Sequence, residues 1–384
     1  MNRREFLQYS SLIPLAGVAP ELLFAAGKQS HPSQIVLLVE LKGGNDGLNT
    51  LIPFRDDNYH RARPKIRVKN GIPLKNRNAV DVALNPYLKQ ILPLWKEGHM
   101  AWVQGVGYNK PSRSHFHSID IWETASTRNN EDRGWLTRVL PESPSSVNGI
   151  VLGDNNLGPM GGRAGSAVAM EDPKTFLRQT KYLNKLHFKA SNSSLAHMLN
   201  VQNQINTAAS ELGRVYRGRK SPVRFPTSRF GRKLELVTQM IINGMNTPVY
   251  KVSLEGFDTH ASQADQHNNL LHHLGGGLKA FTDAMKKAGL WNNVLIMTYS
   301  EFGRRVAENH SGGTDHGSAA PHFVLGGRVR GDIYGKQPSL DPDKLHDGDL
   351  IYNTDFRALY ATLAQRWWRR PNPWAKQFKP IPFV

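Results

Sequence analysis

The sequence predicts an α/β fold: a three-layer sandwich with a mostly parallel central sheet. Short, unbroken apolar runs are typical of strands that are covered on both faces, as in parallel sheets. These runs alternate with longer stretches of helical periodicity, which is the order expected of strand–helix–strand units. The composition, 39% hydrophobic and 21% charged over 384 residues, allows a large core and excludes a disordered chain.

Four apolar runs predict buried strands, and a fifth run is a further candidate. They are residues 35–41, 100–106, 249–254, 294–299 and, as the fifth, 322–325. Helical periodicity predicts helices over residues 86–97, 114–124, 232–243, 268–288 and 354–367. In such sheets the sites lie at the carboxyl ends of the strands, so the segments that follow the strands carry the candidate functional residues.

Residues 1–26 have the pattern of an export signal. Arg3 and Arg4 precede an apolar stretch over residues 12–26 that prolines, a glycine and a glutamate interrupt. The alternative, a single membrane anchor, needs about 20 continuous apolar residues. The RREFL core resembles a twin-arginine signal, which implies export of a folded protein by the Tat machinery to the periplasm or beyond. We therefore expect residues 27–384 to form the mature α/β domain.

The chain carries a formal net charge of +18 and has no cysteine. A surplus of this size favours an anionic partner or surface. The absence of cysteine excludes disulfides, thiolate metal sites and cysteine nucleophiles. Any metal must therefore be held by histidine, aspartate and glutamate.

Much of the charge lies in residues 178–233, which contain twelve Lys or Arg and one acid, Glu211. The segment has no strong strand pattern, so we predict a helical or loop-rich insertion that forms a basic face. Its partner would be an acidic polymer or an anionic membrane surface, and a solvated charged surface is the alternative. Nucleic acid is the weaker candidate, because no aromatic residues alternate with the cations in a recognisable binding motif.

Polar residues follow the first two predicted strands. Asp46 stands in a glycine-rich turn, where an aspartate is also a common turn former. Ser114 begins the helix after the second strand, and unpaired N–H groups at a helix start stabilise a deprotonated nucleophile or an oxyanion. The alternative for Ser114 is a plain helix cap. Arg113 could grip a phosphate or sulfate, and His115 is a candidate acid–base group.

The later strands also end in ligand-type side chains. Asp258 and His260 alternate after the third strand and so point the same way. Glu301 and Arg304 follow the fourth strand, and Asp315 with His316 precede the fifth. We predict a divalent metal site, for Zn, Mn, Mg or Ca, built from residues at several strand ends. The set is Asp46, Asp258, His260, Glu301, Asp315 and His316.

Five motifs resemble a family of Tat-exported bacterial proteins of unknown function. They are a GGxDGLN turn at 43–49, RSHF at 113–116, FDTH at 257–260, SEFGR at 300–304 and GTDHG at 313–317. Together they span most of the mature chain. This family in turn resembles a distant branch of the alkaline phosphatase and sulfatase superfamily.

The wider resemblance implies an alkaline-phosphatase-like sheet, a bimetallic centre and a nucleophile at a helix start. By position, Asp46 resembles the first metal aspartate and Ser114 the nucleophile. Asp258 and His260 resemble the ligands of one metal, and His316 the late histidine ligand. Glu301 takes the place of an Asp-His pair, so the second metal ion lacks a ligand that the superfamily pattern would supply.

The resemblance and the residues together predict an exported hydrolase or transferase. Ser114 would attack a phosphate or sulfate ester in line, the metal would neutralise the oxyanion, and Arg113 or Arg304 would clamp it. His115 or Asp315 would act as acid–base groups. The formylglycine sulfatases are excluded, because Asn109 stands where they carry Cys or Ser. The alternative is a non-catalytic exported protein with a degenerate site that binds a metal and a polyanion.

Replacing Arg3 and Arg4 together by lysine should leave the precursor in the cytoplasm, because the twin-arginine pair is the feature that the export machinery reads. Immunoblots of cytoplasmic and exported fractions would measure this. Normal export of the double variant would contradict twin-arginine targeting.

Overall fold

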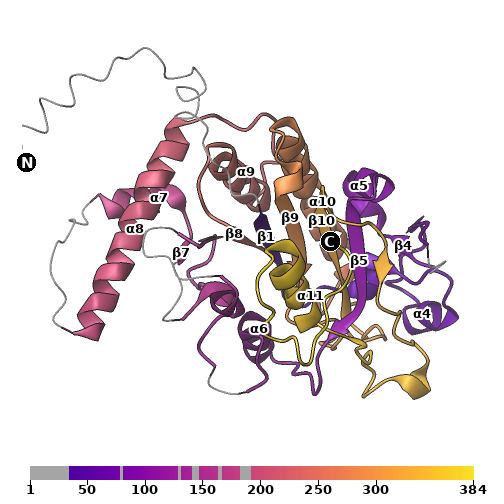
Figure 1. Ribbon diagram of the computed structural model, residues 1–384. Helices are drawn as coiled ribbons and strands as arrows, with labels where there is room; N and C mark the ends of the chain where they lie inside the picture. The colour runs from indigo at the N-terminus through magenta and orange to yellow at the C-terminus, as the bar shows by residue number, and fades with distance from the viewer. Residues whose placement is uncertain (1–33, 78–80, 129–130, 141–146, 163–166, 182–191) are drawn as a thin grey trace, which may run out of the picture.

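The computed structural model describes residues 34–77, 81–128, 131–140, 147–162, 167–181 and 192–384 (Figure 1). The predicted signal segment, residues 1–26, lies outside the described residues. Among the described helices, none is both long and apolar enough to cross a membrane.

The centre of the fold is a nine-stranded sheet with the order β11-β5-β10-β9-β1-β8-β6-β7, in which β12 also pairs with β5. Its strands are β1 (Ile35–Lys42), β5 (Met100–Gly107), β6 (Gly149–Leu152), β7 (Ala167–Met170), β8 (Val249–Glu255), β9 (Val294–Tyr299), β10 (Ala320–Gly326), β11 (Ile333–Tyr334) and β12 (Thr354–Asp355). All neighbouring pairs are parallel except the two that involve β10. The mostly parallel α/β sheet predicted from the apolar runs is therefore confirmed.

The five predicted strands are all present, as β1, β5, β8, β9 and β10. The periodicity did not predict β6 and β7, which have four residues each, and every second residue of β7 is half-exposed. A separate three-stranded sheet joins β2 (Leu51–Ile52), β4 (Ala83–Leu84) and β3 (Ile72–Pro73).

Helices cover both faces of the large sheet, which gives the three layers (Figure 1). One face packs against α9 (Arg229–Ile242) and α10 (Gln263–Lys287), which contribute many buried apolar side chains to the larger core. The other face packs against α6 (His115–Thr124), α11 (Arg357–Thr362) and the π-helical turn η7 (Leu363–Trp367). The shorter helices are α3 (Gly47–Thr50), α4 (Asp57–Ala62), α5 (Leu92–Lys96) and the 3₁₀ turns η2 (Pro86–Ile91), η3 (Trp135–Arg138), η4 (Gly158–Met160), η5 (Trp291–Asn293) and η6 (Pro342–Lys344).

The predicted basic insertion, residues 178–233, is helical over much of its described length. It includes the end of α7 (Pro173–Thr180), all of α8 (Ser193–Arg217) and the start of α9. Helix α8 contacts β7, α7 and α9 at the edge of the sheet (Figure 1). Residues 182–191, with two of the twelve cations, lie outside the described residues.

A buried ion cluster joins the sheet to α6. Lys251 of β8 places its Nζ 3.1 Å from Glu40 Oε2 and 2.7 Å from Glu123 Oε1, and all three side chains are almost fully buried. Burial raises the pKa of Glu123 to about 7, although Lys251 opposes the shift. Ionisation of Glu123 therefore lowers the free energy of unfolding.

Replacing Glu123 by glutamine should remove a pH dependence of stability. Because the pKa of Glu123 is about 7 in the folded state and 4.5 for an ordinary glutamate, its stabilising contribution is fully present below pH 4.5 and is lost as the pH rises through 7. That loss is on the order of 2 to 3 kcal/mol between pH 5 and pH 8.

Urea unfolding at both pH values measures the difference. The Glu123→Gln variant should match the wild type at pH 5 and be the more stable protein at pH 8, whereas Glu171→Gln, at an exposed position, should change neither. Parallel pH profiles for wild type and Glu123→Gln would contradict the assignment.

Candidate active site

The candidate site lies where four loops meet at one edge of the sheet. The loops after β1, β8 and β9 leave the carboxyl ends of adjacent parallel strands, since β1 pairs with both neighbours. Strand β10 runs the other way, so the loop that precedes it reaches the same edge. Segments distant in the sequence are thereby placed together.

Glycines allow two of these loops to touch through their backbones. Gly43 has φ of +119°, and a Cβ there would lie 2.4 Å from the backbone nitrogen of Asp258. A Cβ at Gly313 would lie 2.3 Å from the carbonyl carbon of His260. Side chains at either position would separate the loops.

Three histidines converge on the carboxylate of Asp258. Nε2 of His260 and Nε2 of His316 each lie 3.0 Å from Asp258 Oδ1, and Nε2 of His115 lies 3.4 Å from Oδ2. The two nitrogens of His260 and His316 are 3.0 Å apart. Asp258 and His260 are nearly half exposed, and His316 is the most enclosed of the three histidines, so the group is open to small molecules.

The other ring nitrogen of each histidine is held by an oxygen acceptor. Nδ1 of His115 donates to Glu301 Oε1 at 2.7 Å, and Nδ1 of His316 donates to the carbonyl of Arg113 at 2.8 Å. Nδ1 of His260 lies 3.4 Å from Asp315 Oδ1. A carboxylate or carbonyl oxygen only accepts here, so the proton of each neutral ring is on Nδ1 and the lone pair of each Nε2 faces Asp258.

This arrangement places lone pairs against a carboxylate and against each other, which is unfavourable unless a proton or a cation lies among them. Two protonated Nε2 atoms at 3.0 Å would clash in turn. A metal ion among His115, Asp258 and His316 would satisfy these three groups at once, and histidine ligands commonly donate their other N–H to a carboxylate or carbonyl in this way. The ligand atoms of His115, Asp258 and His316 lie within 4.8 Å of one another, and those around a tetrahedral zinc ion are about 3.3 Å apart. The residues therefore fit a metal ion.

The lowered pKa values of Asp258 and Asp315 suit a cation, whereas the raised pKa of His115 means that a proton competes with a cation for its ring. Burial would raise the pKa of Asp258, but the guanidinium of Arg304 and the neighbouring rings of His316 and His260 lower it to about 2. The hydrogen bond to Glu301 raises the pKa of His115. The hydrogen bond from Asn309 lowers the pKa of Asp315. Asp258 is thus an anion at any neutral pH.

Glu301 is a buried support for His115. Its Oε1 accepts from the backbone N–H of Gly43 at 2.9 Å as well as from His115, and its Oε2 accepts from the hydroxyl of Ser300 at 3.2 Å. Only 3% of Glu301 is exposed. It orients an imidazole that faces Asp258.

Arg304 is buried beneath the same loops. It donates to the carbonyls of Gly43, Gly44, Phe257 and Thr314, and to Asp258 Oδ1 at 2.6 Å. Its side chain has no exposed surface. The predicted clamp on a substrate oxyanion would require this guanidinium to leave its backbone partners.

Asp46 is directed away from the histidines into the protein. Its Oδ2 pairs with Arg63 Nη1 at 2.6 Å and accepts from Gln263, and Oδ1 caps α3 through the N–H of Asn49. Burial would raise the pKa of Asp46, but Arg63, His267 and Gln263 lower it overall. Arg63 and Gln263 were not predicted as site residues; Arg63 caps the end of α4 and Gln263 begins α10.

Ser114 and Arg113 flank the group at the start of α6. Ser114 occupies the N-cap position, but its side chain accepts no backbone hydrogen bond, and the residue is exposed. Arg113 reaches across to Asp349, with Nε at 2.9 Å and Nη2 at 2.8 Å from Oδ2. Its backbone carbonyl holds His316.

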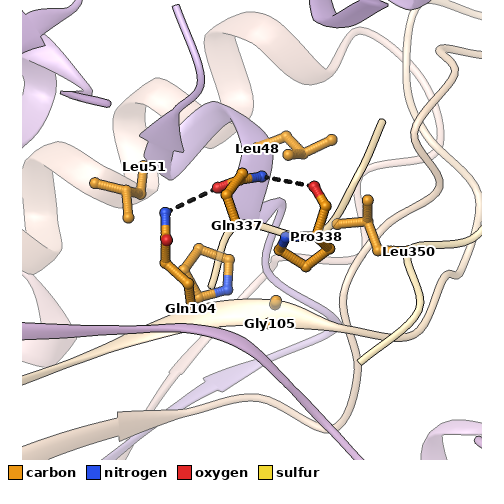
Figure 2. Close-up of a pocket in the computed structure, with 9 residues that line it drawn as sticks. Leu48, Leu51, Gln104, Gly105, Gln337, Pro338 and Leu350 are labelled. Carbon is orange, nitrogen blue, oxygen red and sulfur yellow. Dashed lines mark hydrogen bonds between the residues drawn. The ribbon is translucent and has the colours of Figure 1, made fainter. Parts of the chain in front are cut away.

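A small pocket lies beside α3 (Figure 2). Leu48, Leu51, Pro338 and Leu350 give it an apolar lining, and Gln104 donates to Gln337 at 2.8 Å across it. It contains no charged side chain, so it does not suit an anionic ester.

Comparisons with known proteins identify a family. The family model described as "Protein of unknown function (DUF1501)" matches residues 162–376, more than half of the chain. This confirms the family prediction that rested on the five motifs. No curated protein matches the sequence.

The solved structures that match this chain include three enzymes. The lipoteichoic acid synthase LtaP from Listeria monocytogenes is 11% identical, with 84% of this chain and 74% of that chain covered and a TM-score of 0.35. The alkaline phosphatase of the Antarctic bacterium TAB5 is 12% identical, with 79% of this chain and 95% of that chain covered and a TM-score of 0.35. The PsFucS1 sulfatase from Pseudoalteromonas sp. is 11% identical, with 86% of this chain and 72% of that chain covered and a TM-score of 0.33.

Replacing His316 by alanine should weaken the binding of zinc and remove the rise in melting temperature that zinc gives. The reason is that a ligand that binds only the folded state stabilises it. Asp258→Ala and His260→Ala should act in the same direction. Zinc titration by calorimetry and thermal unfolding with and without zinc would measure both effects.

His272→Ala is the matched control, because this exposed histidine on α10 bonds only to Gln90 among the described contacts. Unchanged zinc stoichiometry in all three site variants would rule out the metal assignment.

Proposed function

We propose that this chain, which belongs to the DUF1501 family of proteins of unknown function, is a metal-dependent hydrolase of phosphate or sulfate esters. The observation that carries the proposal is the convergence of three histidine Nε2 atoms on the carboxylate of Asp258 at a half-exposed edge of the sheet. An ester oxyanion can reach such a group from solvent. The resemblance of the sequence motifs to the phosphatase and sulfatase superfamily supports the same chemistry.

His115, Asp258, His260 and His316 would hold the metal. Three imidazoles and one carboxylate suit zinc, and they suit Mn less well. Mg and Ca prefer oxygen ligands, so this donor set fits them poorly. Bound there, the ion would polarise the ester and offset the charge that develops on its oxygens.

Ser114 is the nucleophile in this proposal. It precedes His115 at the start of α6, where free backbone N–H groups and the helix dipole lower the cost of negative charge. Its Oγ forms a bond to phosphorus or sulfur while the bond to the leaving oxygen breaks. The serine proton passes to water and the leaving alcohol takes one from water. A second water molecule then hydrolyses the seryl ester, which releases phosphate or sulfate.

Three predicted site residues have positioning roles in this proposal. Arg304 fixes the backbone of the loops, and Glu301 orients His115. Asp315 orients His260, and its lowered pKa makes it a poor proton donor. Arg113 stays the candidate clamp, because more than a third of its side chain is exposed beside Ser114.

One observation favours the non-catalytic alternative. The pairing of Asp46 with Arg63 and Gln263 withholds a carboxylate that the superfamily resemblance assigns to the metal centre. A protein with one metal ion and no turnover would fit this arrangement. Zinc binding without hydrolysis of any aryl phosphate or aryl sulfate would support that alternative.

Export through the Tat pathway and binding of a polyanion by residues 178–233 remain proposals of the same kind. The described cations of this segment include Arg214, Arg217 and Arg219 at and after the end of α8. Such a face would hold an acidic polymer or membrane surface near the enzyme, with an affinity that falls as salt rises.

Replacing Ser114 by alanine should abolish turnover of 4-nitrophenyl phosphate or sulfate by the zinc-loaded protein, because the attacking oxygen is removed. Stability should change by well under the roughly 1 kcal/mol of a lost helix cap, since Oγ caps no backbone N–H. Release of 4-nitrophenol measures the turnover, and urea unfolding measures the stability.

Ser339→Ala, at another exposed serine, is the control and should keep full activity. A Ser114→Ala variant that retained turnover would exclude the serine nucleophile while leaving the metal assignment intact.

A further inference from the structure

We propose that a second pocket, separate from the metal centre, binds a sugar that carries a phosphate or sulfate group. The pocket lies between the 65–70 loop, the start of η2 and the first turns of α10, and has a volume of about 150 Å³. Its lining includes none of the histidines that face Asp258. The inference therefore goes beyond the proposed function and stands without it.

The rim of the pocket is cationic. Lys65, Arg67 and Lys69 line it. Lys65 and Lys69 are exposed, whereas Arg67 is half-buried and donates to the carbonyls of His60 and Pro64. No aspartate or glutamate is among the lining residues. In the described part of the chain, Lys65 and Lys69 form no ion pair. The carboxylate of Glu308 accepts from the backbone N–H groups of Lys65 and Ile66 and offsets part of this charge. The remaining positive charge attracts an oxyanion.

The floor of the pocket is rigid and polar. Asn49 is 2% exposed, and its side chain donates to the carbonyl of Ile66 at 2.8 Å and accepts from Tyr59 and Arg63, both at 2.9 Å. Its hydrogen-bonding capacity is largely used within the protein. A floor fixed in this way needs little rearrangement when a ligand enters.

Two further polar side chains line the pocket and retain hydrogen-bonding capacity. His267 is 1% exposed, and its Nε2 lies 2.9 Å from Asn45 Oδ1, an acceptor. Burial lowers the pKa of His267 to about 4, so the ring is neutral and Nδ1 is an acceptor. Within the described residues Nδ1 has no partner. Asn268 accepts from Asn85 through Oδ1 at 3.4 Å, which leaves its NH₂ group as a donor.

These groups match a hydroxylated ligand better than a bare anion. A lone imidazole acceptor needs a donor, which a sugar hydroxyl supplies and a sulfate dianion does not. The amide of Asn268 donates to a hydroxyl or ring oxygen. Tyr87 stands at the rim with 46% of its surface exposed and offers an aromatic face to the apolar side of a sugar ring.

The test uses glucose 6-phosphate and glucose 6-sulfate as probes, with glucose and inorganic phosphate beside them, titrated calorimetrically into the full-length protein. EDTA is present throughout, so that binding at the metal centre is excluded. Both charged sugars should bind saturably and more tightly than either glucose or phosphate. Phosphate binding as tightly as glucose 6-phosphate, or no saturable binding of either charged sugar, would overturn the proposal.

Variants locate the binding. Lys65→Gln with Lys69→Gln should weaken glucose 6-phosphate binding by about tenfold at low salt and flatten its salt dependence. Tyr87→Ala should weaken the binding of the charged sugars and leave that of phosphate unchanged. Lys376→Gln with Lys379→Gln removes the same charge at exposed positions elsewhere and should have no effect. An equal loss in this control pair would show that net charge, and not the pocket, binds the sugar.

Discussion

The buried guanidinium of Arg304 is the interaction on which the candidate site depends. Its hydrogen bonds reach the loop after β1, the loop after β8 and the loop before β10, while its own backbone belongs to the loop after β9. Without Arg304 these loop carbonyls would be buried without hydrogen-bond partners, which costs free energy. One side chain therefore satisfies several loop ends and fixes the position of Asp258 as well.

The same loops hold the three histidines around Asp258, and the Nε2 lone pairs of these histidines face its carboxylate. Each Nδ1 is committed to an oxygen of the protein, so each Nε2 has to find its partner in the space beside Asp258. Pre-organised ligands of this kind lower the cost of binding a cation, because little rotamer freedom remains to be lost. In the proposed metal site stability and metal binding would thereby be linked, as in other sites where binding energy is also folding energy.

The sequence was a good guide to the buried strands and to the loops that carry ligand-type side chains. Apolar runs identified β1, β5, β8 and β9, and the rule that sites lie at strand ends correctly placed Asp258, His260 and His316 near one another. Periodicity could not show that β10 runs antiparallel, because direction is set by the path of the connection and not by the residues of the strand.

Side-chain direction was the part that sequence could not supply. Asp46 follows a strand as a metal ligand would, yet it turns inward because Arg63, seventeen residues later, offers it a buried positive partner. Arg304 likewise follows a strand, but burial and four carbonyls decide its role. Such choices depend on which donors the folded chain brings within 3 Å, and no local pattern encodes them.

The backbone contacts at Gly43 and Gly313 bear on how such a site changes over evolution. At each glycine a single methyl group would push against the main chain of the loop that carries Asp258 and His260. A substitution in one loop is therefore felt as a displacement in its neighbour, and a compensating change would have to arise in a segment about 50 to more than 200 residues away. The two contacts tie three distant segments of the chain together, so none of the three can be displaced alone.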